Sequence, residues 1–333
     1  MPTVWLGRGV SNNIAFIDAL QKQNCSVVVS HHLEQWAGQE YAASFNEPDC
    51  GGQEYIQWCA EMVKTYGFDY FMPGRCLGDF SQFPPSMSHQ LVMGCAPETA
   101  NDLDDKALFY QKCHDAGLDF VADFVTFTNL NSFQSGVELL RRKGHDRLCF
   151  KPSKGVFGQG FRILTDKNPL DSIVRGSSLA LRTADFERWL GESQSEMDEM
   201  ILMPLFNGKE VSVDGSFDGT HYRMVARRKN GPAAGQTILT EPSIYESAEK
   251  IARLFGLRGV FNIQFMHHND RAMILEVNPR AAGGIGIGLL ADVQIVVPEI
   301  FTAGEQSAQG VLIPTQEQNI VCESRYFVKK NTA

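Results

Sequence analysis

Short apolar runs alternate with amphipathic stretches over the first third of the chain. The runs are rich in β-branched and aromatic residues, which favours strands, and the stretches between them have helical spacing. Strands and helices in alternation are typical of βαβ units, so we predict a parallel sheet in this region. The predicted strands are Val4–Leu6, Ser26–Val29 and Tyr70–Met72, and the predicted helices are Ile14–Gln21 and Tyr55–Tyr66.

The pattern changes after residue 95. A polar segment, Asn101 to Lys106, predicts the start of a helix that runs to about His114. Beyond residue 120 we expect a separate small lobe, with a strand ending at Pro152, a glycine-rich stretch and a helix over Asp185–Leu190. Later elements are expected as strands at Met200–Leu205, Glu210–Asp214, His221–Arg228, Val260–Met266 and Ala272–Val277, with a helix at Ser243–Phe255.

Composition narrows the class of protein. The 333 residues are 43% hydrophobic and 21% charged, close to the average of soluble globular proteins, which excludes disordered, collagen-like and coiled-coil chains. Lys and Arg number 30 against 39 Asp and Glu, so the net charge is -9. General nucleic-acid binding needs a basic surface, which this balance does not provide. Anionic substrates must therefore meet local basic residues.

The cysteines and the apolar runs predict the compartment. Eight cysteines are scattered without a C-x-x-C pair or zinc-finger spacing, so we interpret them as reduced thiols. No apolar stretch approaches the about 20 residues that cross a bilayer. We expect a cytoplasmic protein without a membrane segment.

The first predicted strand ends in Gly7-Arg8-Gly9, a G-x-G turn. The third glycine of the dinucleotide-binding fingerprint is missing. We interpret Gly7 and Gly9 as residues that let the backbone turn, rather than as a dinucleotide site.

The most informative pattern is a strand pair near the C-terminal end of the chain. Alternate residues of a strand share a face, and here polar and apolar residues separate cleanly. The polar face carries Asn262, Gln264, Glu276, Asn278 and Arg280, and the apolar face carries Phe261, Ile263, Phe265, Leu275 and Val277.

A turn at Asn269-Asp270 predicts that these two strands form a hairpin. One register centred on residue 270 puts Gln264 opposite Glu276 and Asn262 opposite Asn278, with paired Cβ atoms about 5 Å apart. Oxygen-bearing side chains with one carboxylate suit Mg²⁺, which keeps several waters and shares its coordination with phosphate oxygens. The alternative is a solvated sheet face.

Two further segments suit a nucleotide. Lys151 at a strand end precedes three glycines, Gly155, Gly158 and Gly160, which let backbone N–H groups approach phosphate oxygens. Taken alone this is weak, and it is not a Walker P-loop. The apolar strand Met200–Leu205 can hold an adenine edge, and a following carboxylate, Glu210, can accept hydrogen bonds from a ribose. Two ordinary strands with one wet face would give the same pattern.

In order along residues 101 to 288, these motifs resemble the ATP-grasp superfamily. The resemblance is carried by Asp105-Lys106 at a helix start, the Lys151 strand with its glycines, the strand ending in Asn207-Gly208-Lys209-Glu210, and the polar hairpin. It implies a mixed α/β ATP-grasp fold with an N-terminal parallel α/β domain. The implied divisions are 1–95 for that domain, 96–119 with 203–333 for the core, and 120–202 for a lid lobe.

The resemblance also implies roles for individual residues. Lys106, Lys151, Gly155, Gly158 and Gly160 would contact the ATP phosphates, the backbone near Met203 and Leu205 the adenine, Glu210 the ribose, and Gln264, Glu276 and Asn278 two Mg²⁺ ions, with Mn²⁺ as an alternative. Lys151 and Arg280 would be catalytic. Many members carry a carboxylate where this chain has Gln264 and a glutamate where it has Met203.

The resemblance implies an ATP-dependent carboxylate–amine ligase that joins small molecules through an acyl phosphate and releases ADP and phosphate. Two alternatives stay open: activation of bicarbonate or a purine-pathway intermediate, and a catalytically inactive nucleotide-binding regulator. The partners expected are small-molecule carboxylates and amines, no nucleic acid, and a second copy in a homodimer. The candidate substrate-binding residues are Arg75, Arg223, Arg280, Gly283 and Gly284.

Overall fold

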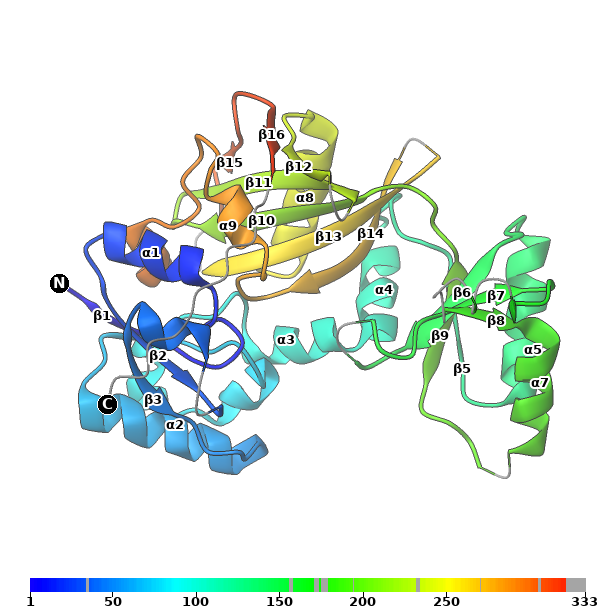
Figure 1. Cartoon of the computed structure of the whole chain (residues 1–333), viewed down its shortest axis with the longest axis horizontal. Coiled ribbons are helices and arrows are strands. Elements are labelled where there is room, and N and C mark those ends of the chain that lie inside the picture. Colours follow the sequence, from blue (N-terminus) through cyan, green and yellow to red (C-terminus); the bar gives the residue numbers. More distant parts are fainter. Residues whose placement is uncertain are drawn as a thin grey trace.

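The computed structural model of the chain describes residues 1–33, 36–155, 158–170, 174, 179–193, 195–231, 234–269, 271–304 and 307–321. Its described residues form three sheets: an N-terminal sheet, a large central sheet, and a smaller sheet in a lobe at the right of Figure 1. Val156 and Phe157 of the glycine stretch, Asp270 of the predicted turn, and Cys322 lie outside the described residues.

The N-terminal sheet is parallel throughout, as predicted. Its order is β3-β2-β1-β4, and the rings of Trp5 and Phe71 on adjacent strands stack with centroids 3.8 Å apart. The short strand β3 was not predicted, because Ala43 to Asn46 contains no apolar run and is largely exposed. The elements are β1 (Thr3–Leu6), α1 (Ile14–Lys22), β2 (Ser26–His31), β3 (Ala43–Asn46), α2 (Gly52–Tyr66) and β4 (Tyr70–Met72).

The central sheet has the order β14-β13-β10-β11-β12-β16, with β15 paired to β11. Helix α8 (Pro242–Leu254) covers its apolar face, where Val211, Val213 and Ile263 join the buried residues of the helix in one core. The opposite face carries the polar residues. The strands are β10 (Glu210–Phe217), β11 (His221–Gly231), β12 (Gly235–Ile238), β13 (Val260–His268), β14 (Arg271–Asn278), β15 (Gly310–Leu312) and β16 (Gln318–Ile320).

The third sheet forms the lobe, in the order β5-β9-β6-β7-β8. Four phenylalanines, Phe127, Phe133, Phe150 and Phe186, pack between this sheet and its helices as a separate core. The elements are β5 (Val125–Phe127), α5 (Leu130–Arg142), β6 (Leu148–Pro152), β7 (Arg162–Thr165), β8 (Ala180–Arg182), α7 (Thr183–Glu192) and β9 (Met200–Pro204). The strands and the helix predicted here are confirmed, and the division of the whole chain into domains stays a prediction.

The predicted start of a helix in this polar segment is confirmed, and an earlier helix that was not predicted precedes it. Two helices meet at Asp105, because Pro97 starts an earlier helix, α3 (Pro97–Asp104), and the extended backbone of Asp105 ends it. The Asp105 carboxylate accepts the Leu108 N–H at 3.2 Å and so caps α4 (Lys106–Asp115). The remaining elements are α9 (Ile285–Gly288) and four 3₁₀ helices, Ala37–Glu40, Leu77–Gln82, Pro85–Gln90 and Pro298–Phe301.

None of the helices in the described part of the chain has the length and apolar character needed to span a membrane. The seven described cysteines are unpaired thiols, and most of them are buried.

A buried ion pair holds the middle of the polar sheet face. Arg227 of β11 donates from Nε to Asp214 of β10 at 2.5 Å, and its other nitrogens donate to Ser212 at 3.1 Å and to Gln236 at 2.7 Å. Asn262 of β13 donates to the same aspartate at 2.8 Å. Burial raises the pKa of the Asp214 carboxyl, and the charge of Arg227 opposes that rise. The pair therefore ties three strands together through one carboxylate.

Replacing Arg227 by Met should lower the free energy of unfolding by about 3–5 kcal/mol, because Asp214 would stay buried without its cation. Urea denaturation measures this. Arg271→Met is the matched control, since Arg271 and its partner Asp119 are both exposed and such pairs contribute about 0–1 kcal/mol. Equal losses in the two variants would contradict the role given to the buried pair.

Candidate active site

A cavity of 260 Å³ lies where the lobe meets the polar end of the central sheet. Strands of both sheets, the start of α4 and the glycine stretch all contribute to its wall. Most sequence-predicted nucleotide residues are thereby brought together. The lining residues are Lys106, Cys149, Lys151, Pro152, Gly155, Gly158, Gln159, Phe161, Met203, Pro204, Leu205, Phe206, Gln264, Met266, Leu275 and Glu276.

The predicted hairpin register is confirmed. Asn262 pairs with Asn278 and Gln264 with Glu276 across β13 and β14. The register shifts directly after Gln264, so that Phe265 pairs with Ile274 and Leu275 is left as an extra residue. Leu275 therefore lines the cavity beside Glu276, although strict alternation predicted that it faces the other way.

Both predicted lysines lie in this cavity. Lys151, at the end of β6, donates to the hydroxyl of Tyr110 at 3.3 Å. Burial lowers the pKa of Lys151 to about 8, and the nearby carboxylate of Glu276 opposes that fall. Burial also lowers the pKa of Lys106, whose amine donates to the Gly155 carbonyl at 2.7 Å. Desolvated ammonium groups of this kind gain more from an anion than lysines in water do.

The glycine stretch has the backbone geometry that only glycine adopts easily. Gly155, Gly158 and Gly160 have φ of 151°, 65° and 72°. At Gly160, moreover, an added Cβ would come within 2.7 Å of the Pro152 ring. Side chains at these positions would strain the turn or move it off β6.

The adenine candidates line the cavity, and the ribose candidate does not. Met203 and Leu205 line the cavity, next to Phe206 and the unpredicted Phe161 and Met266. Glu210 lies outside the lining residues at the start of β10, where its carboxylate is paired with Lys229.

The metal candidates meet at one edge of the cavity. Asn278 donates from its amide nitrogen to Glu276 at 3.2 Å, which leaves its amide oxygen available. Gln264 donates in the same way to Asn262 at 3.3 Å. Asn262 itself is fully buried, and its amide nitrogen donates to Ser212 and Asp214. Asn262 therefore belongs to the buried network.

The donor set fits a hard cation that shares its ligands. Among the described residues, no three His, Cys, Asp or Glu side chains come together as a metal cluster. The three candidate side chains offer one carboxylate, from Glu276, and two neutral amide oxygens, from Gln264 and Asn278. Mg²⁺ uses such a set when phosphates and waters complete its coordination shell. Burial lowers the pKa of Arg280 next to this edge, and Glu276 opposes the fall.

The substrate candidates are not all gathered here. Gly283 and Gly284 follow Arg280, and an added Cβ at Gly284 would lie 2.7 Å from the Arg227 guanidinium. Arg223 is paired with Asp218 at the other end of β11, 2.7 Å between Nε and the carboxylate. Arg75 follows β4 of the N-terminal sheet, with its guanidinium 3.9 Å from the centre of the Tyr55 ring.

Tyr110 is the main residue that sequence reasoning missed. It is fully buried on α4, and its hydroxyl donates to the Leu275 carbonyl at 2.9 Å and accepts from Lys151. It thus links α4, β6 and β14. Its position four residues after Lys106, on the same helix face, was the only signal in the sequence.

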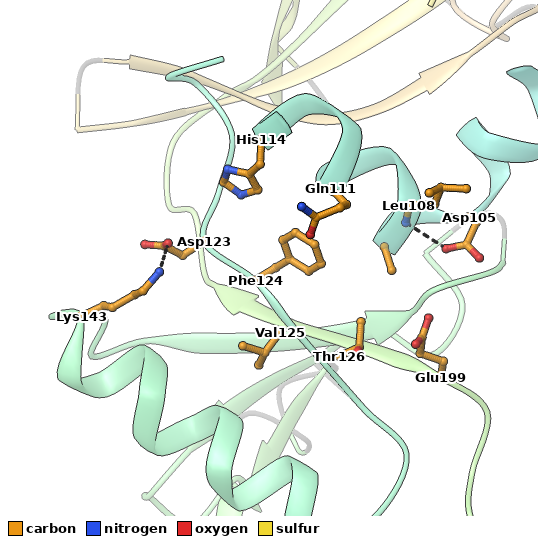
Figure 2. A pocket seen from close by; sticks show the side chains of 11 residues that line it. Asp105, Leu108, Gln111, His114, Asp123, Phe124, Val125, Thr126, Lys143 and Glu199 are labelled. Atoms are coloured by element: carbon orange, nitrogen blue, oxygen red, sulfur yellow. Dashed lines mark hydrogen bonds and ion pairs between the residues drawn. The ribbon is translucent and has the colours of Figure 1, made fainter. Parts of the chain in front are cut away.

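A larger and more open groove of 820 Å³ runs between α4 and the strand β5. Figure 2 shows Gln111 and His114 of α4 facing Phe124 and Val125 across it. Its polar groups are already engaged: Asp123 with Lys143 and His145, and His114 with the Ala122 carbonyl. The 260 Å³ cavity, in contrast, is lined by two desolvated lysines, Lys106 and Lys151, and neither has a described ion pair with a carboxylate.

Comparisons with known proteins agree with this geometry. The family model described as "ATP-grasp in the biosynthetic pathway with Ter operon" matches residues 196–323. The arginine-specific large chain of carbamoyl phosphate synthase from Bacillus subtilis (strain 168) is 26% identical over 205 residues, covering 57% of this chain and 18% of that protein. The chain thus spans less than a fifth of the length of such curated relatives.

Solved structures share the fold over nearly the whole chain. N5-carboxyaminoimidazole synthetase from Staphylococcus aureus, complexed with ADP, superposes with a TM-score of 0.68 at 14% identity, covering 95% of this chain and 80% of that one. L-amino acid ligase from Bacillus licheniformis gives a TM-score of 0.63 at 12% identity, covering 91% and 74%. With its mixed parallel and antiparallel sheets, the chain has the fold of these enzymes, and it is similar in sequence to the ATP-grasp family over residues 196–323.

Proposed function

We propose that the protein is an ATP-dependent carboxylate–amine ligase, which forms an amide or peptide bond between small molecules and releases ADP and phosphate. The observation that carries the proposal is the single cavity that combines two desolvated lysines, an apolar wall and the Glu276 edge. Each of these features suits a different part of ATP.

The chemistry explains why these groups belong together. A carboxylate is a poor electrophile because its charge is delocalised and oxide is a very poor leaving group. Transfer of the γ-phosphoryl group to one carboxylate oxygen turns that oxygen into part of phosphate, which leaves readily when an amine attacks the carbon. Phosphoryl transfer needs positioning and charge stabilisation more than covalent help from the protein.

Within this proposal, Lys106 and Lys151 hold the phosphates under the glycines Gly155, Gly158 and Gly160. Met203 and Leu205 offer backbone groups to the adenine, and Glu210 is the ribose ligand once it exchanges its contact with Lys229. Arg280 is assigned to the transferred phosphoryl group or the acyl phosphate, because burial lowers the pKa of its guanidinium, which lies near Glu276.

Gln264, Glu276 and Asn278 are the residues that would hold two Mg²⁺ ions, or Mn²⁺ in their place. Bound metal ions would neutralise charge on the phosphates. Among these three residues, the chain supplies one carboxylate, that of Glu276, and two neutral amide groups. The Asn278 amide, by donating to Glu276, orients that carboxylate.

Two other functions are distinguished by simple readouts. The similarity to carbamoyl phosphate synthase large chains favours, as second candidate, activation of bicarbonate or a purine-pathway intermediate. Bicarbonate-dependent ADP release without an added carboxylic acid would identify that reaction. A catalytically inactive nucleotide-binding regulator is less well supported, because Lys106, Lys151 and Glu276 are all present. We also include a cytoplasmic setting, which the free cysteines support, and a homodimer.

The bond broken in ATP tests the proposal. A screen of amino acids and small amines, singly and in pairs, should find substrates that release ADP, with an amide product detected by mass spectrometry. Oxygen-18 in the substrate carboxylate should then appear in the released phosphate, because that oxygen becomes the bridging atom. AMP and pyrophosphate, or phosphate without label, would reject the acyl-phosphate mechanism.

Glu276→Gln should leave folding intact and reduce turnover by roughly 10³-fold or more, because the only carboxylate among the three proposed metal ligands is lost. The matched control is Glu138→Gln, an exposed carboxylate on α5. Steady-state ADP release at saturating Mg²⁺ measures both variants. Near-normal turnover of Glu276→Gln would remove the metal assignment.

Nucleotide binding should be coupled to proton uptake near pH 8. With a pKa of about 8, Lys151 is partly neutral in the free protein, and an adjacent phosphate raises that pKa, so ADP binding draws in a proton. Affinity should fall as the pH rises above this value. Calorimetry of ADP with EDTA, in buffers of different ionisation heat, measures the uptake. Lys151→Ala should lose most of it, and uptake equal to wild type would exclude Lys151 as the phosphate contact.

A further inference from the structure

A second group of cations lies at the carboxyl edge of the N-terminal sheet. Arg8 follows β1 and Arg75 follows β4, and these two strands are neighbours in the order β3-β2-β1-β4. In this sheet, β2 and β3 lie on one side of β1, and β4 lies on the other side. The strand order therefore reverses between β1 and β4. In open parallel sheets, ligands bind outside the carboxyl ends of the strands at this reversal.

Glycines bring the two turns into contact. Gly9 has φ of 106°, and an added Cβ there would lie 2.4 Å from the Gly74 carbonyl oxygen. At Gly74 an added Cβ would lie 2.7 Å from the Arg8 carbonyl oxygen. The two backbones therefore touch without side chains between them, which sets Arg8 and Arg75 on either side of one carboxylate.

That carboxylate is Glu47, whose side chain is fully buried. It accepts hydrogen bonds from the Arg8 backbone N–H at 2.6 Å, from Ser30 at 2.7 Å and from Tyr55 at 3.2 Å. The guanidinium groups of Arg8 and Arg75 approach it only to 3.9 and 3.8 Å, too far for a hydrogen bond. Glu47 thus attracts both cations while its oxygens are occupied by other donors.

Most N–H donors of the Arg8 and Arg75 guanidinium groups therefore make no hydrogen bond among the described contacts. Arg75 stacks on Tyr55 and gives one hydrogen bond to the Cys50 carbonyl at 2.9 Å, and its buried Nε has no hydrogen-bond partner in the described part of the chain. For the Arg8 side chain, the described contacts are only the ion pairs with Glu47 and with Asp49, whose side chain is 90% exposed. The two half-buried arginines thus face one buried carboxylate, Glu47, and one exposed carboxylate, Asp49, whose charge water screens more strongly.

The site lies next to the substrate side of the candidate active site. Asn13, in the turn that begins at Gly7, donates to the Ala282 carbonyl at 3.0 Å, two residues after Arg280. Gly286 of α9 packs so closely on α1 that an added Cβ would lie 2.7 Å from the Ala15 Cβ. The turn after β1 and the segment after Arg280 therefore lie side by side.

We propose that Arg8 and Arg75 form an oxyanion site for a second anionic group of the substrate, a carboxylate or a phosphoryl group remote from the reacting carboxyl. Guanidinium forks suit both anions, since each offers two oxygens to paired N–H donors. The assignment of this anion to the substrate rests on the proposed ligase function, whereas the site itself rests on the Arg8, Arg75 and Glu47 geometry. The ligase would thus take dianionic rather than monoanionic acids.

The test is calorimetric titration of the full chain with inorganic phosphate and, separately, with succinate. A saturating magnesium complex of a non-hydrolysable ATP analogue fills the nucleotide phosphate positions in every run. Wild type should bind at least one anion, and Arg8→Gln and Arg75→Gln should each weaken it about tenfold or more, as expected for a lost charged hydrogen-bond donor. Preference for phosphate or for succinate distinguishes a phosphorylated substrate from a dicarboxylate.

Arg271→Gln, an exposed arginine on the central hairpin, is the matched control and should bind the anions as wild type does. All variants should keep wild-type affinity for the ATP analogue. Arg8→Gln remains decisive if loss of the Arg75 stacking impairs folding. Failure of wild type to bind either anion, or unchanged affinity in Arg8→Gln, would overturn the oxyanion site. If wild type did not bind the ATP analogue at all, that result would instead count against the ligase proposal.

Discussion

The pairing of β13 with β14 is the constraint on which the candidate active site depends. A slip of one residue would turn Gln264 and Glu276 toward α8 and bring apolar residues to the cavity. The register is held by the apolar core beneath the sheet, where Ile263 and Phe265 are fully buried, and by the Asp214–Arg227 network beside Asn262. The local bulge then adds Leu275 to the same wall, so that an apolar surface and a carboxylate become neighbours.

Around this face, charge is concentrated and only partly compensated. Lys106, Lys151 and Arg280 are all desolvated, and Glu276 opposes the resulting pKa fall in each of them. Such an arrangement is costly in an empty protein and becomes favourable when a polyanion enters. The N-terminal sheet has a similar arrangement. Glu47 attracts Arg8 and Arg75 without accepting a hydrogen bond from either guanidinium group. Among the described contacts, none of these cations donates a side-chain hydrogen bond to a carboxylate, so each keeps donors for a bound anion.

Much of this could be predicted from the sequence because it depends on local periodicity. Alternation along residues 260–278 gave the strands, the polar face and the pairing of Gln264 with Glu276, and the helical spacing of residues 243–255 gave α8. The bulge at Leu275 could not be predicted, since the residues that contact β14 there, Phe120 and Tyr110, are far away in the sequence. Nor could the place of Tyr110, whose contacts with Leu275 and Lys151 cross three segments of the chain. The joint position of Arg8, Arg75 and Glu47 likewise arises from strand order, which no local pattern encodes.

The central claim is that the cavity between the lobe and the central sheet binds the metal–nucleotide complex. A crystal structure with Mn²⁺ and a non-hydrolysable ATP analogue tests it most directly, because anomalous scattering locates the metal independently of the nucleotide density. The account predicts manganese at the oxygens of Glu276 and Asn278, phosphates between Lys106 and Lys151, and adenine against Met203 and Leu205. Manganese elsewhere, or a nucleotide in the open groove between α4 and β5, would contradict it.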